Sequence, residues 1–86
     1  MNINDLIAIV KKKLITQIVI EKIDIEDKSF LHKNHTGHQE GKFHLKLTIK
    51  SKELNNLNRV EGNKKIYKIL NQEIKDYIHS LQILIN

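Results

Sequence analysis

Cysteine, proline and tryptophan are absent from the 86 residues, and only three glycines occur. Without a thiol, the chain forms no disulfide, has no cysteine nucleophile and offers no sulfur of its own to zinc or an iron–sulfur cluster. The lack of proline and of any Gly/Ser-rich stretch gives no sign of a linker, so we expect one domain over residues 1–86. Aromatic residues make up 5% of the chain, so the core must be built from isoleucine and leucine.

Long apolar runs are absent too. The run LIAIV at residues 6–10 is too short to span a bilayer, and the lysines of KKK follow it, whereas a secretory signal has its charges first. We therefore expect a soluble protein that does not interact with membranes. We further expect that it is cytoplasmic and that it is a monomer when isolated.

Motifs of enzymatic chemistry are also missing. No serine lies in a nucleophile elbow, no pair of acids has a recognisable catalytic spacing, and GNKK at residues 62–65 lacks the pattern of a phosphate-binding loop. We therefore expect that the protein is not an enzyme.

Arginine is scarce although the chain is basic, with a net charge of +5. Arg59 is the sole arginine, and the other cations are lysines. Because arginine is the preferred bidentate partner of phosphate and guanine, its scarcity argues against specific readout of a nucleic acid. Weak attraction to polyanions through the lysines stays open.

Histidine, in contrast, is concentrated in one short stretch. The sequence FLHKNHTGHQEGKFH at residues 30–44 holds four of the five histidines, and His32, His35 and His38 recur at every third residue. Three interpretations stay open: a transition-metal site, a phosphate-facing basic patch, or a solvated loop that tolerates polar residues. The remaining one, His79, begins an otherwise apolar segment, where a histidine is usually a satisfied core or rim residue.

Hydrophobic periodicity predicts the elements around this loop. Apolar residues at helical spacing predict helices over residues 4–15 and 59–74, and alternating or β-branched runs predict strands over 16–27, 43–51 and 78–86. A helix that joins two strands favours a parallel crossover. We therefore predict an α+β fold of order α-β-β-α-β, with a small three-stranded mixed sheet and the helices packed on one face.

The same patterns assign individual residues. Asn4 is the expected N-cap of the first helix, and Gly62 is expected to weaken the second by about 1 kcal/mol relative to alanine. His44 begins the polar face of its strand. The apolar stripes of the two helices are expected to contain Leu6, Ile7, Val10, Leu14, Val60, Ile66, Tyr67, Ile69, Leu70 and Ile74.

Several short motifs stand in a fixed order along the chain. The first is an acid-x-Ser-x-x-His motif, and it is followed by a histidine that begins a predicted strand and a serine that ends it. A valine and a tyrosine follow in the second predicted helix. The last predicted strand contains Ile-His-Ser-Leu. The residues concerned are Asp27, Ser29, His32, His44, Ser51, Leu57, Val60, Tyr67, Ile78, His79, Ser80 and Leu81.

In this order the motifs resemble those of the BolA family, over residues 21–85. The family pattern has Arg-His-Arg in the second helix, where this chain reads Gly62-Asn63-Lys64, and alanine after the last histidine, where it has Ser80. The resemblance implies a class II KH-like fold, which agrees with the predicted order of elements.

The resemblance also implies a function. BolA-like proteins pair with a monothiol glutaredoxin, and the two proteins share a [2Fe-2S] cluster. The glutaredoxin provides a cysteine and bound glutathione as ligands. The roles of BolA-like proteins are cluster assembly, cluster trafficking and iron or redox regulation. Motif positions assign His79 as one ligand and His32 as the other, with His35 and His38 as alternates. No cluster is expected to be bound tightly by the isolated chain.

A second function is implied because some members are described as DNA-binding transcriptional regulators. The residues available for this role are cations of the second helix, although the replaced Arg-His-Arg centre weakens the match. They are Arg59, Lys64, Lys65 and Lys68.

Overall fold

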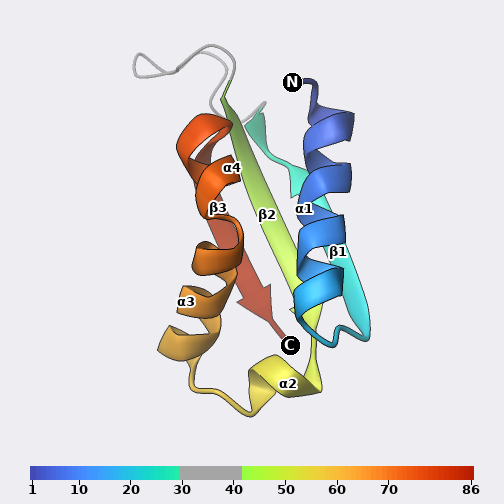
Figure 1. Cartoon of the computed structure of the whole chain (residues 1–86), viewed down its shortest axis with the longest axis vertical. Helices are drawn as coiled ribbons and strands as arrows, with labels where there is room; N and C mark the ends of the chain where they lie inside the picture. The colour runs from blue at the N-terminus through green and yellow to red at the C-terminus, as the bar shows by residue number, and fades with distance from the viewer. Residues whose placement is uncertain (30–41) are drawn as a thin grey trace.

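A computed structural model describes residues 1–29 and 42–86 (Figure 1). The described residues form four helices and three strands. None of the described helices is both long enough and apolar enough to cross a bilayer. The elements are α1 (Ile3–Gln17), β1 (Lys22–Asp27), β2 (Phe43–Lys50), α2 (Lys52–Asn55), α3 (Arg59–Ile69), α4 (Asn71–Asp76) and β3 (Ile78–Ile85).

The strands form one sheet in the order β1-β2-β3. β1 and β2 are antiparallel, with Lys22 opposite Lys50 and Asp27 opposite Leu45. β3 runs parallel to β2, so the chain must return along the sheet between them, and α2, α3 and α4 form this crossover. The predicted three-stranded mixed sheet is therefore confirmed within the described part of the chain.

The core lies between the sheet and the helices on one of its faces (Figure 1). α1 buries residues at the spacing of one helix face. From Leu45 onward β2 buries every second residue, as a half-buried strand does, and the adjacent His44 is buried as well. The predicted periodicity of these two elements is confirmed. The buried aliphatic residues are Leu6, Val10, Leu14, Ile18, Leu45, Leu47, Ile49, Leu54, Ile66, Leu70 and Ile78.

The first helix is longer than predicted at both ends. Asn2, rather than Asn4, is the N-cap, and its side chain accepts a hydrogen bond from the backbone N–H of Asp5 at 2.8 Å. Thr16 continues the helix, where the sequence predicted a strand, and its hydroxyl donates to carbonyl oxygens one turn earlier. β1 therefore begins only at Lys22.

The second predicted helix, residues 59–74, is two helices in the structure. α3 and α4 are separated at Leu70, which is buried in the core. The predicted apolar stripe is wrong in part, because Val60 and Tyr67 are 61% and 43% exposed. Tyr67 lies at the rim, where its hydroxyl donates to the carbonyl oxygen of Leu81 at 3.2 Å.

Gly62, rather than Val60, is the buried residue in the first turns of α3. A Cβ atom at this position would lie 3.1 Å from Cδ1 of Ile85 and 3.8 Å from the carbonyl oxygen of Leu54. The missing side chain therefore lets α3 approach β3 closely. This packing offsets the low helix propensity that the sequence predicted as a cost.

Candidate functional site: a histidine pair at the start of the third strand

The described histidines meet where β3 begins beside β2. Strand pairing is irregular here, because Phe43 lies opposite Ile78 but the next residue, His44, lies opposite Ser80. His79 is therefore an extra residue on β3, a one-residue bulge. A bulge changes the face on which the following side chains lie, and it brings Ser80 to the same face as His44, away from the core.

The rings of His44 and His79 are in contact. Their centroids are 4.9 Å apart and their planes make an angle of 63°, an edge-to-face arrangement. His44 is only 6% exposed, whereas His79 is exposed to solvent. One imidazole is thus enclosed by the fold, and the other lies at the surface against it.

A hydrogen bond holds the ring of the buried histidine. Nδ1 of His44 and Oγ of Ser80 are 2.6 Å apart. A serine hydroxyl can donate to an unprotonated ring nitrogen or accept from a protonated one. The contact therefore fixes the orientation of the His44 ring without deciding its tautomer.

The acid-x-Ser part of the first motif holds the backbone of His44. A side-chain oxygen of Asp27 accepts a hydrogen bond from the N–H of Ser29 at 2.9 Å, a local turn typical of aspartate. Ser29 Oγ accepts from the N–H of His44 at 3.1 Å, and the carbonyl oxygen of His44 accepts from the N–H of Lys28 at 2.7 Å. The chain just before residues 30–41 is therefore tied to the histidine pair.

The predicted ligands His32, His35 and His38 lie outside the described residues. His79 is described, and the histidine against it is His44, which the sequence placed only on the polar face of a strand. One available signal was that both residues stand at the starts of neighbouring parallel strands, which meet at one end of a sheet. The bulge that aligns the two rings leaves no mark in the sequence.

The histidine pair alone does not form a closed metal site. Within residues 1–29 and 42–86, no three side chains of histidine, aspartate or glutamate gather to hold an ion. A neutral imidazole can still donate a nitrogen lone pair to a transition metal, provided that other ligands complete the site. His79 has both this chemistry and the exposure that a shared site requires.

An ion pair lies beside the acid-x-Ser motif, at the end of β1. Oε2 of Glu26 and Nζ of Lys28 are 2.9 Å apart, and the hydrogen bond from Lys28 lowers the pKa of Glu26 below its ordinary value of 4.5. Glu26 is therefore ionised and paired at neutral pH.

The cations predicted for nucleic-acid binding lie along α3. Lys64 and Lys68 are exposed, as is Arg59 at the start of the helix. Lys65 is half-buried and forms an ion pair with Glu53, with Nζ and Oε2 2.7 Å apart. The hydrogen bond from Lys65 lowers the pKa of Glu53. The ammonium of Lys65 is therefore paired with a carboxylate of the same chain.

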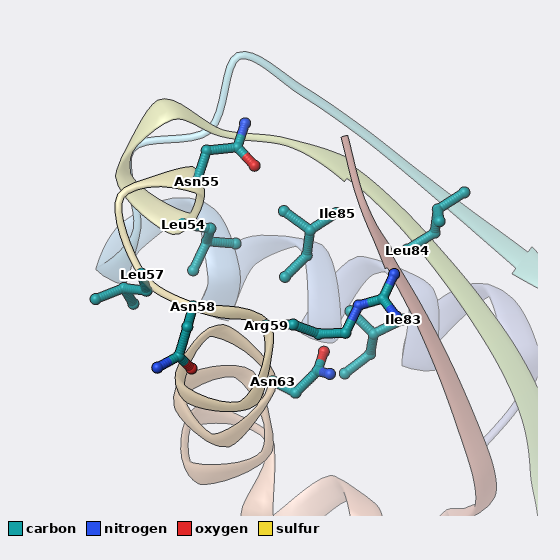
Figure 2. Close-up of a pocket in the computed structure, with 9 residues that line it drawn as sticks. All are labelled: Leu54, Asn55, Leu57, Asn58, Arg59, Asn63, Ile83, Leu84 and Ile85. Atoms are coloured by element: carbon teal, nitrogen blue, oxygen red, sulfur yellow. The ribbon is translucent and has the colours of Figure 1, made fainter.

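Arg59 also borders a pocket of about 150 Å³ between the α2–α3 turn and the end of β3 (Figure 2). Leu54 and Ile85 form part of its aliphatic lining, and Arg59 and Asn63 form part of its polar lining (Figure 2). Oδ1 of Asn63 is buried and has no hydrogen-bond partner among the described residues. The pocket lies at the opposite end of β3 from the histidine pair.

Comparison with known sequences gives one consistent family. The family described as BolA-like protein matches residues 14–86. A curated relative from Haemophilus influenzae, named DNA-binding transcriptional regulator BolA, is 29% identical over 75 residues, which are 87% of this chain and 70% of that protein.

Solved structures of the same family have the same fold. The BolA domain of SufE1 from Arabidopsis thaliana is 26% identical with a TM-score of 0.77, over 92% of this chain and 87% of that one. BolA1 from the same plant is 25% identical with a TM-score of 0.78, over 93% and 88% of the two chains. A bol-like protein from Babesia bovis, 13% identical with a TM-score of 0.71 over 91% and 79%, shares the fold.

Proposed function

Because the chain belongs to the BolA family, we propose that it is a non-enzymatic partner of a monothiol glutaredoxin and that the two proteins bind a shared [2Fe-2S] cluster. In this role it acts in cluster assembly or trafficking, or in iron and redox regulation. The family match over residues 14–86 and the similarity to solved BolA domains support the proposal.

The observation that carries the proposal is the exposed imidazole of His79 at one end of the sheet. The histidine-rich segment departs from this same end, because Ser29 is bonded to His44, the neighbour of His79. It also returns there, since the N–H of Phe43 donates to the carbonyl oxygen of Tyr77 at 2.9 Å. The described residues on both sides of this segment therefore lie at the same end of the sheet as His79.

The residues present suit a cluster that a partner completes. Histidine replaces cysteine as an iron ligand in some [2Fe-2S] centres, so a chain without cysteine can still ligate iron. When bound, the cluster supplies one-electron chemistry. His79 provides one nitrogen and His32 the other, with His35 and His38 as alternates, and the partner's cysteine and glutathione provide the thiolates.

The proposal is tested by mixing the chain anaerobically with a monothiol glutaredoxin, glutathione, ferrous iron and sulfide. Gel filtration should show one complex that contains both proteins. Its visible circular dichroism should differ from that of the glutaredoxin alone with the same reagents. An unchanged spectrum and separate elution would overturn the proposal.

Variants of the loop histidines identify the second ligand. We expect His32→Ala to remove most of the mixed-cluster spectrum, His35→Ala to reduce it partly, and His38→Ala to leave it almost unchanged. Wild-type spectra from all three variants would show that the second ligand lies outside this segment.

DNA binding is a second candidate function, favoured by the name of the H. influenzae relative and by the exposed Arg59, Lys64 and Lys68. A specific regulator should bind its duplex about a thousandfold more tightly than competitor DNA at physiological salt. Lys64→Gln with Lys68→Gln should weaken binding, and Lys11→Gln with Lys12→Gln on α1 is the matched control. Binding without sequence preference that is lost steeply with salt would leave only general basicity.

A further inference from the structure

Ser80 connects the two histidines of the candidate site. It follows His79 in β3 and, because of the bulge, pairs with His44 on β2. Its Oγ lies 2.6 Å from Nδ1 of His44. The BolA pattern has alanine at this place, and alanine has no side-chain oxygen to make this bond. We propose that Ser80 is a positioning residue for His79 and that it acts through His44.

His44 is suited to support another side chain because it is held at several points. Its backbone N–H and carbonyl oxygen are bonded to Ser29 and Lys28, and its Nδ1 is bonded to Ser80. Its 6% exposure also leaves little free volume in which the ring could turn. The bond to Ser80 is made by the ring itself, so it helps to fix which way the ring faces.

His79 has little support apart from that ring. It is exposed and, as the bulged residue, has no pairing partner on β2. Within the described residues its side chain makes no hydrogen bond, and the contact that restricts it is the edge-to-face packing on His44 at 4.9 Å. If the His44 ring turns, the surface against which His79 packs changes with it.

The consequence concerns cluster binding, so this inference rests on the proposed function. A ligand that is already held near its binding orientation loses less conformational freedom when the partner arrives. Substituting a group that orients a metal-ligating histidine commonly changes metal affinity by about 10–100-fold. Ser80 acts on His79 only through His44, so its effect should be smaller. We expect its hydroxyl to slow the loss of the cluster by about fivefold.

Two substitutions separate the hydroxyl from the shape of the side chain. Ser80→Thr and Ser80→Val have nearly the same shape and both suit a strand, but only threonine keeps the hydroxyl. Ser80→Ala, which adds no atoms, replaces the valine variant if valine prevents folding. Urea unfolding of each isolated chain shows which variants are folded.

The first measurement uses NMR of the isolated chain. Wild type and Ser80→Thr should show a strong nuclear Overhauser effect between the ring protons of His44 and His79 and one dominant χ1 rotamer of His79. Ser80→Val should show a weaker effect and averaged rotamers. Wild-type spectra from Ser80→Val, or the same loss in Ser80→Thr, would overturn the inference.

The second measurement is the rate at which the mixed cluster is lost to an iron chelator. We expect a rate about five times that of wild type for Ser80→Val and the wild-type rate for Ser80→Thr. Equal rates for wild type and Ser80→Val would overturn the inference while leaving the proposed function intact. If wild type forms no mixed cluster, the proposed function fails, and an NMR change in Ser80→Val then assigns the serine a structural role only.

Discussion

The two faces of the sheet are carried by the same strands but differ in how their side chains are held. On β2, Leu45 and Leu47 face the helices and are buried, whereas Lys46 and Thr48 face away and are only half-buried. The covered face is held by aliphatic packing, in which one apolar side chain can often replace another of similar volume at small cost in stability. The opposite face has, at one end, a histidine pair in which the His44 ring is hydrogen-bonded to Ser80 and the His79 ring packs against it. Stability and the proposed ligand thus lie on opposite faces and can be altered separately.

The largest effect is expected from adjacent residues of β2 that face opposite ways. Leu47→Ala should lower the free energy of unfolding by about 2–5 kcal/mol, because the side chain is fully buried and its removal leaves a cavity. Thr48→Ala should cost less than about 1 kcal/mol. Urea unfolding measures both, and equal losses would show that the two faces do not differ in this way.

The Lys13–Glu73 ion pair joins α1 to α4 and departs from the aliphatic packing of the covered face. Glu73 is 6% exposed, its Oε2 is 2.6 Å from Nζ of Lys13, and its Oε1 has no hydrogen-bond partner among the described residues. Lys13→Met should lower the free energy of unfolding by about 2 kcal/mol, because it leaves the Glu73 carboxylate without its partner. This loss is smaller than that expected for a fully enclosed ion pair, because the lysine is partly exposed. Adding Glu73→Leu should recover most of the lost stability. A double variant as unstable as Lys13→Met would contradict the idea that the unpaired Glu73 carboxylate causes the loss.

A smaller effect tests why glycine stands inside α3. Gly62→Ala should change stability little, because a gain of about 1 kcal/mol in helix propensity is offset by the tight approach to Cδ1 of Ile85. Ile85→Val removes this atom, so in that background Gly62→Ala should stabilise by about 1 kcal/mol. A double-mutant cycle in urea measures the difference, and the same change in both backgrounds would rule out the contact.

The smallest effect is expected from the half-buried ion pair between Lys65 and Glu53. The hydrogen bonds from Lys65 and from the N–H of Val19 lower the pKa of Glu53 below 4.5. A lowered pKa in the folded state stabilises the fold above the ordinary value, and this contribution is lost as the pH falls through the lower pKa. Glu53→Gln should therefore slightly reduce the difference between urea midpoints at pH 7 and pH 3, and an unchanged difference would contradict this.

The sequence predicted the covered face better than the rest because its signal is periodic. β2 alternates, and α1 repeats Leu6, Val10 and Leu14 at helical spacing, since each has one buried side. In α3 the buried residue near the start is Gly62, which has no hydrophobic signal, so the exposed Val60 was assigned to the core instead.

The candidate site was predicted in part, and by resemblance rather than by periodicity. The motif order singled out His79, and the structure places it at the surface. Its contact with His44 depends on a bulge, which shifts strand pairing by one residue. The bond to Ser80 follows from the same shift, so counting along the strand could not find it.

The most direct test of the account is the mixed cluster formed by His79→Ala, compared with Gln82→Ala. Both residues are exposed on β3, so both variants should unfold at the wild-type urea concentration within error. Each variant is mixed with the glutaredoxin, glutathione, iron and sulfide, and the visible circular dichroism is recorded. We expect Gln82→Ala to give the wild-type mixed-cluster spectrum and His79→Ala to give only the spectrum of the glutaredoxin alone. A wild-type mixed spectrum from His79→Ala, with a wild-type cluster lifetime, would contradict it.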